Sequence, residues 1–218
     1  MLTRVLILAA GEGSRWANYR GTLKHLAIIE DEPILHRTVR QLKQYADDIV
    51  VVGSAPAHHV QGTTFCLPET NPALEMDKFA SSISLWLPKG RTVIVFGDVY
   101  FTDEAIHAIM TNTEDWRFYL RPGPSSITGK DCKEIFAVTF DDSALDLLQS
   151  AVTKLRHFKT SAAGWSLFRL LTIGTPSASH TDKSMFNYGR HVVIDDWTED
   201  FDYPRDLDNW EANRSISS

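Results

Sequence analysis

A single stretch organises this chain: Val5-Leu6-Ile7-Leu8-Ala9-Ala10-Gly11-Glu12-Gly13-Ser14-Arg15, with Lys24 nine positions further on. The apolar run predicts a buried strand, and the glycines directly after it predict a tight turn whose backbone can approach a ligand closely. Such a turn leaves several N–H groups pointing at one place, where they can bind anionic oxygens. Arg15 and Lys24 add two positive charges at the same end of the strand. The stretch therefore predicts a polyphosphate site.

Other glycine patterns fit this stretch less well. The P-loop pattern GxxxxGK[ST] is absent. The dinucleotide pattern GxGxxG is met at Gly11 and Gly13, but Trp16 stands at the third glycine, where a large side chain blocks close packing of helix on strand. An NAD(P)-binding Rossmann oxidoreductase stays open as an alternative, as does a plain glycine turn with two solvated basic side chains.

The composition is that of an ordinary globular protein, with 43% hydrophobic and 23% charged residues among 218. A formal net charge of -6 favours neither nucleic acid nor an anionic membrane as a partner. The two cysteines lack zinc-binding spacing and indicate a reducing compartment, and the first apolar run is too short to span a membrane. We expect a cytoplasmic protein with one domain over residues 1–214 and a frayed tail at 215–218. A homodimer is compatible with this composition.

Apolar patterning along the rest of the chain predicts alternating strands and helices. Strands are expected after the first one at 49–52, 63–67, 92–96, 116–120, 135–140 and 191–194, and helices after Pro33, at 79–87, after Thr102, at 144–155, at 165–171 and at the C-terminus. Strand, helix and strand at this spacing form βαβ units. We therefore predict an α/β fold, a single-domain three-layer α/β/α sandwich with a mainly parallel, mixed central sheet.

The connections between these elements carry fewer signals. The segment 121–126 is expected to be an open loop, and 174–190 a long polar connection of unassigned role. The pair His58-His59 has no third ligand at metal spacing, so we expect it in a surface turn.

Carboxylates gather at two places in the sequence. Asp98 follows the predicted strand 92–96, at the end where open α/β sheets bind ligands. Mg²⁺ prefers such hard oxygen donors and often uses only one or two carboxylates. Residues 195–207 contain six acidic side chains, which repel one another unless they face water or a cation. Asp98 is therefore our first candidate metal ligand.

The run Leu8 to Arg15, with Lys24 and Leu26 beyond it, resembles the pattern LAAGxGxRxxxxxPKxL of nucleotidyltransferases of the nucleotide-diphospho-sugar-transferase type. These include sugar-phosphate nucleotidyltransferases, phosphocholine cytidylyltransferases and MobA-like NTP transferases. Leu23 stands where the family usually has proline, and the spacing from Arg15 to Lys24 is slightly longer. The resemblance implies a Rossmann-like, GT-A-type fold and an enzyme that joins a nucleoside triphosphate to a phosphorylated acceptor with release of pyrophosphate.

The resemblance also implies roles for particular residues. Arg15 and Lys24 are the expected catalytic cations, the first at the leaving group and the second at the α-phosphate. Mg²⁺ is expected on Asp98, which matches the family's GD aspartate, and on Asp202, because 201–207 resembles the ending IDTPEDL; Asp200 and Asp196 come next. The expected nucleotide-binding residues are Leu8, Ala9, Ala10, Gly11, Glu12, Gly13, Ser14, Asn71, Ser81 and Ser82.

The last three of these residues are carried over from a base-binding segment, NPxY followed by NNxxSL. In this chain Asp77-Lys78 replaces the asparagine pair. Ser81 and Ser82 are equally well interpreted as helix-capping residues.

The donor and the acceptor stay open. The closing motif favours CTP, and the acceptor is a sugar phosphate or a phosphocholine-like molecule. Four aromatic side chains are candidates for contact with a choline group or, equally, for the core: Trp165, Tyr188, Trp197 and Tyr203. A nucleotide-sugar glycosyltransferase is a further alternative, although it would want a DxD motif that Asp98-Val99-Tyr100 does not supply. A catalytically silent nucleotide-binding protein is another.

Overall fold

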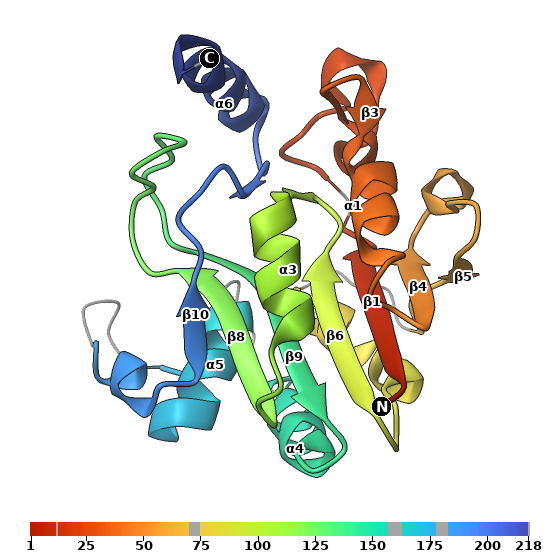
Figure 1. Ribbon diagram of the computed structural model, residues 1–218, viewed down its shortest axis with the longest axis vertical. Helices are drawn as coiled ribbons and strands as arrows, with labels where there is room; N and C mark the ends of the chain where they lie inside the picture. The colour runs from red at the N-terminus through yellow and green to blue at the C-terminus, as the bar shows by residue number, and fades with distance from the viewer. Residues whose placement is uncertain (12, 70–74, 157–162, 178–182, 218) are drawn as a thin grey trace.

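A seven-stranded sheet forms the centre of the computed structural model, which describes residues 1–11, 13–69, 75–156, 163–177 and 183–217 (Figure 1). The expectations for Glu12 and Asn71 lie outside the described residues. The strand order is β10-β8-β9-β6-β1-β4-β5. The strands are β1 Thr3–Ala9, β4 Asp48–Gly53, β5 Thr64–Cys66, β6 Arg91–Phe96, β8 Trp116–Arg121, β9 Glu134–Asp141 and β10 His191–Val193. All the strands expected from the sequence are thus confirmed, within a few residues.

The sheet is mainly parallel. β1 pairs in parallel with β4 and β6, β4 with β5, and β10 with β8, whereas β9 runs antiparallel to both β6 and β8. The central strands are apolar after their first one or two residues because both faces of the sheet are covered, and every residue of β6 is buried. Because β1, β4 and β6 are parallel, their carboxyl ends open onto one edge of the sheet.

Helices cover both faces of the sheet. α1 Ile34–Leu42 and α3 Asp103–Thr111 pack on one face, and α2 Glu75–Ala80, α4 Leu145–Leu155 and α5 Ala163–Ile173 on the other (Figure 1). The amphipathic pattern of α1 places its apolar side chains on the sheet. Short 3-10 helices lie at Tyr19–Gly21, Lys24–Leu26, Pro56–His58, Ile83–Leu85 and Ser184–Tyr188. The three-layer α/β/α, Rossmann-like fold is confirmed.

A second hydrophobic cluster lies beyond the carboxyl ends of the parallel strands. α6 Pro204–Ser217 lies there, together with the two-stranded sheets β2 Ile28–Ile29 with β3 Glu32–Pro33, and β7 Val99–Tyr100 with β11 Glu199–Asp200 (Figure 1). The buried members of this cluster are Trp16, Ala27, Ile29, Ile34, Tyr100, Phe201, Leu207 and Trp210. It ties the start of the chain to its end, next to the first glycine turn.

Several local expectations were wrong. The helix expected at 79–87 begins earlier and ends at Ala80, because the Ser81 and Ser82 hydroxyls donate to the carbonyls of Lys78 and Phe79. Arg121 is no loop residue but the buried last residue of β8. His58 is buried rather than exposed in a surface turn.

The C-terminal part also differs from expectation. The residues 215–217, expected to be frayed, continue α6. The connection expected over 174–190 contains a 3-10 helix at Ser184–Tyr188. Among the described residues, the structure has no helix with both the length and the apolar character needed to cross a bilayer.

Candidate active site

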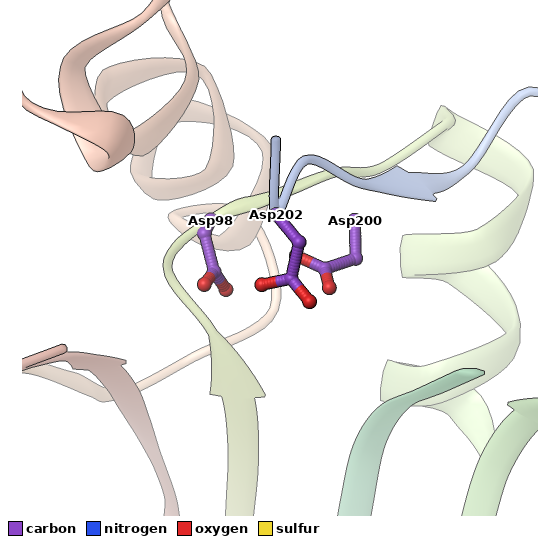
Figure 2. Close-up of side chains that lie close together, drawn as sticks. All are labelled: Asp98, Asp200 and Asp202. Carbon is purple, nitrogen blue, oxygen red and sulfur yellow. The ribbon is translucent and has the colours of Figure 1, made fainter. Parts of the chain in front are cut away.

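A short antiparallel pairing brings together acidic residues that are far apart in the sequence. In the β7–β11 pair, Val99 lies opposite Asp200. The Phe201 N–H extends this pairing by donating to the Asp98 carbonyl at 3.3 Å. Asp98, directly after β6, therefore meets Asp200 and Asp202, and their carboxylates gather side by side (Figure 2). One oxygen from each lies within 4.8 Å of the others.

Lys24 supplies the positive charge at the centre of this acidic cluster. Its Nζ lies 2.6 Å from Asp98, 2.8 Å from Asp202 and 3.7 Å from Asp200. The side chain is only 8% exposed. Burial alone lowers the pKa of Lys24, but the three carboxylates raise it above its ordinary value, so the ammonium stays charged. The structure thus brings two expected catalytic and metal-binding groups, Lys24 and Asp98, into direct contact.

The three aspartates differ in their electrostatics. Burial raises the pKa of Asp98, but Lys24, His25 and Lys78 together outweigh it and hold that pKa below its ordinary range. Burial, together with the like charges of Asp98 and Asp202, raises the pKa of Asp200 well above its ordinary value. Asp200 Oδ1 is buried and accepts no hydrogen bond from the residues that the structure describes. Among the described residues, the nearest cation to this oxygen is Lys24, 3.7 Å away, so it can still act as a metal ligand.

These carboxylates fit a hard divalent cation. Mg²⁺ takes oxygen ligands and keeps several waters, so two or three carboxylate oxygens converging from separate segments are a suitable protein contribution. Asp98 and Asp202 are the ligands expected from the sequence, and Asp200 is the third. Asp196 is not part of this group, since its carboxylate accepts from the Thr102 hydroxyl and the Thr198 N–H near the start of α3.

Arg15 stands at the rim of the site. Its Nη2 donates to Asp202 Oδ1 at 2.9 Å, and its guanidinium lies 5.2 Å from the centre of the Tyr203 ring. Burial lowers the pKa of Arg15, but Tyr203 and Asp202 raise it overall. The side chain is 55% exposed. Arg15 is therefore accessible to a ligand, whereas Lys24 is buried beneath it.

The glycine turn leads from β1 into this site. Gly13 has a positive φ of 61°, a left-handed conformation that glycine adopts without strain, and its carbonyl accepts from the N–H groups of Trp16 and Ala17. Leu8, Ala9 and Ala10 are buried, and their contact with a nucleotide stays a prediction.

Trp16 is an anchor of the segment between Arg15 and Lys24. Its side chain is buried in the second hydrophobic cluster, and its indole N–H donates to the Thr22 carbonyl at 3.1 Å. The residue that breaks the dinucleotide pattern thus packs in the core of the segment that carries both cations.

Gly97 permits the close approach of β6 to β1. A methyl group added at Gly97 would lie 2.9 Å from Cβ of Ala9 and 3.3 Å from the Leu8 carbonyl oxygen. The absence of a side chain at this position therefore allows Asp98 to lie directly beside the glycine turn.

A buried ion pair anchors the strand that carries Asp200. Arg121, at the end of β8, binds both carboxylate oxygens of Glu199, and the Thr128 hydroxyl donates to the same carboxylate. Lys130 Nζ lies 2.9 Å from Glu134 and 3.7 Å from Glu199. The sequence gives one signal for these positioning residues, a charged residue directly after the run 116–120.

The remaining expected binding residues are scattered. Ser81 and Ser82 are buried and hydrogen-bonded at the end of α2, so the structure gives them a capping role, and contact with a base stays a prediction. Trp165 is buried in the main core and Tyr188 is exposed. Of the four aromatic candidates for contact with the acceptor, Tyr203 is the one that lies beside Arg15 and next to the acidic cluster.

The solved structures that match this fold include nucleotidyltransferases. A putative glucose-1-phosphate thymidylyltransferase from Bacillus anthracis is 17% identical with a TM-score of 0.60, and the match covers 98% of this chain and 96% of that one. The CTP:phosphocholine cytidylyltransferase from Streptococcus pneumoniae is 12% identical with a TM-score of 0.60, covering 99% and 100%. A 4-diphosphocytidyl-2C-methyl-D-erythritol synthase from Anaerococcus prevotii is 11% identical with a TM-score of 0.55, covering 100% and 99%. At such identities the likeness shows the fold alone.

The family follows from the sequence match. The model of the MobA-like NTP transferase domain matches residues 5–122, just over half of the chain, so the protein belongs to the MobA-like NTP transferases, a nucleotidyltransferase family. A search of curated proteins gives no match. The matched region contains the glycine turn, Arg15, Lys24 and Asp98, but not Asp200 or Asp202.

Proposed function

We propose that this protein is a Mg²⁺-dependent nucleotidyltransferase that transfers a nucleoside monophosphate from a nucleoside triphosphate to a phosphorylated small molecule. The observation that carries the proposal is the position of Lys24, whose ammonium lies among Asp98, Asp200 and Asp202 at the carboxyl end of the parallel strands. A buried cation and a cluster of carboxylates beside a glycine turn are what a triphosphate and its metal ion require.

In this reaction an oxygen of the acceptor's phosphate forms a bond to the α-phosphorus of the triphosphate. The bond between the α-phosphorus and the bridging oxygen breaks, and pyrophosphate leaves with the electron pair. No proton has to move when the attacking phosphate is already ionised, so the protein needs no general base. Positioning and stabilisation of charge supply the rate.

The chain's residues have distinct parts in this scheme. The backbone of the turn 11–14 binds phosphate oxygens, and Arg15 lies where it can meet the leaving pyrophosphate. Asp98 and Asp202, with Asp200 beside them, would hold Mg²⁺, which would offset charge on the phosphates. Lys24, whose ammonium lies among these carboxylates, would stabilise the charge on the α-phosphate.

CTP is the donor we propose, and a sugar phosphate or a phosphocholine-like molecule is the acceptor. The support is the C-terminal motif around Asp202 and the likeness in fold to a phosphocholine cytidylyltransferase. Tyr203, whose ring lies beside Arg15 and Arg205, is the aromatic residue we propose for contact with an acceptor that carries a quaternary ammonium.

A calorimetric panel tests this function. CTP, UTP, GTP, ATP, dTTP and NAD⁺ are titrated, with and without Mg²⁺, into the wild type, Asp98→Asn and the matched control Asp146→Asn, which changes an exposed carboxylate on α4. We expect Mg²⁺-dependent binding of one triphosphate that is lost in Asp98→Asn and kept in the control. Pyrophosphate release with a panel of phosphorylated acceptors then identifies the reaction. Binding of NAD⁺, or of no nucleotide, contradicts the proposal.

A further inference from the structure

A further lysine, Lys78, contacts the glycine turn at Gly11. It lies on α2, and a methyl group added at Gly11 would be 3.0 Å from its Nζ and 3.4 Å from its Cε. The ammonium therefore rests against the backbone of the turn, in space that exists because residue 11 has no side chain. In the sequence, Lys78 follows Asp77 where the resembled family has an asparagine pair.

Lys78 differs from the other two cations of the site in having no direct carboxylate partner among the described residues. Within the described ranges its Nζ forms no hydrogen bond and no ion pair, and the side chain is half-buried. By contrast, Lys24 is surrounded by three aspartates and Arg15 is paired with Asp202. Lys78 is therefore available to pair with an anionic ligand.

Lys78 faces the same site as the acidic cluster. Burial raises the pKa of Asp98, and the charge of Lys78 is among those that lower it, after Lys24 and His25. The N–H groups at a glycine turn and an ammonium resting on that turn both attract anionic oxygens. Three cations, Arg15, Lys24 and Lys78, thus surround the place where the turn is expected to bind phosphate.

We propose that Lys78 is a phosphate-binding residue, which contacts an oxygen of the donor's triphosphate at the glycine turn. The proposal rests on the proposed function, since it assigns a further residue to that nucleotide site. The contact would come from α2, a helix that packs on the face of the sheet opposite to α1 and α3.

The test uses inorganic pyrophosphate as the probe, because pyrophosphate is the leaving group of the proposed reaction and has no base or sugar. Pyrophosphate with Mg²⁺ is titrated by calorimetry into the wild type, Lys78→Met, Lys78→Arg and Lys89→Met. Lys89 is an exposed lysine just before β6, at the opposite end of the sheet, and serves as the matched control. The titrations are repeated at two salt concentrations, and thermal unfolding of each variant is recorded without ligand.

We expect Lys78→Met to weaken pyrophosphate binding about tenfold, as for loss of one charge-assisted hydrogen bond. Its salt dependence should be shallower than that of the wild type, because one charge fewer is engaged. Lys78→Arg should keep most of the affinity, Lys89→Met should match the wild type, and thermal unfolding should not change.

Two results would contradict the role of Lys78 and the proposed function separately. Wild-type binding that is unchanged in Lys78→Met overturns the role of Lys78 and leaves the proposed function standing. A wild type that binds neither pyrophosphate nor any triphosphate overturns the proposed function and the phosphate contact together. If Lys78→Met unfolds at a lower temperature, Lys78→Arg decides: affinity lost despite the retained charge also overturns the proposal.

Discussion

Arg121 and Glu199 face each other in a bidentate ion pair, with both N–O distances at 3.0 Å and side-chain exposures of 2% and 1%. The pair joins the end of central strand β8 to β11, the strand that presents Asp200. Removing one partner leaves the other charge buried without compensation, which is costlier than losing the attraction itself.

We therefore expect Glu199→Gln and Arg121→Met each to lower the free energy of unfolding by about 3 to 5 kcal/mol. The matched control is Arg40→Met, which breaks the more exposed pair with Glu32 and should cost about 0 to 1 kcal/mol. Urea denaturation at neutral pH measures all three variants. Equal losses for the buried and the exposed pair would show that Glu199 does not anchor the acidic strand.

Lys24→Met should increase the affinity of the acidic cluster for a divalent cation. The ammonium and the metal ion compete for Asp98 and Asp202, and two like charges at such distances repel by several kcal/mol even at an effective dielectric constant of about 20. We expect Mn²⁺, titrated by electron paramagnetic resonance, to bind Lys24→Met about tenfold or more tightly than the wild type. Asp98→Asn should bind it poorly. If Lys24→Met binds Mn²⁺ no more tightly than the wild type, the metal ion does not bind at this acidic cluster.

Arg15→Met should affect turnover far more than stability. The ion pair with Asp202 is largely exposed, so its loss should cost about 0 to 1 kcal/mol of unfolding free energy. If Arg15 stabilises the leaving pyrophosphate, turnover should fall by about 10²- to 10³-fold. Arg20→Met is the matched control, because Arg20 is in the same segment but pairs with Asp208 and Glu211. Pyrophosphate release assays and thermal unfolding, run on the same preparations, separate the two effects.

His58 should make the protein less stable in mild acid. The imidazole is buried against His25, and neither ring nitrogen has a hydrogen-bond partner among the described residues. Burial lowers the pKa of His58 in the folded state, whereas in the unfolded chain it is near 6.5. Below about pH 6.5 the unfolded state therefore binds a proton at His58 that the folded state does not bind. The free energy of unfolding therefore decreases as the pH is lowered.

His58→Leu removes both the proton uptake and the two unpaired nitrogens. We expect its advantage in unfolding free energy over the wild type to grow as pH falls from about 7 to 5. His59→Leu, a change at the exposed neighbour, should leave the pH slope unchanged. The check is urea denaturation at a series of pH values; parallel curves for His58→Leu and the wild type would exclude this source of acid sensitivity.

Much of the fold follows from local sequence. The apolar runs at β1, β4 and β6 predicted buried parallel strands because both faces of those strands are covered, and the period of Ile34 to Leu42 predicted a helix on the sheet. Asp98 was a candidate ligand since it directly follows a strand. Arg15 and Lys24 were candidates because they follow a glycine turn.

The helix expected over 79–87 shows that apolar spacing alone does not determine where a helix begins and ends. Apolar spacing favoured one helix, but two serine hydroxyls compete for backbone carbonyls and end α2 at Ala80. Likewise Arg121 follows an apolar run and looked like the start of a loop. Its burial depends on Glu199, which is 78 residues away in the sequence.

The sequence by itself determined the strands, the glycine turn and the kinds of charged group at the site, because these depend on neighbours within a few residues. Only the tertiary structure decided which charges meet. The pairing of β7 with β11 brings Asp200 and Asp202 to Asp98, and the packing of α2 places Lys78 on Gly11. These contacts join segments far apart in the chain, so the spacing of apolar residues within one segment does not predict them. They form only when the packing of the buried strands brings the segments together.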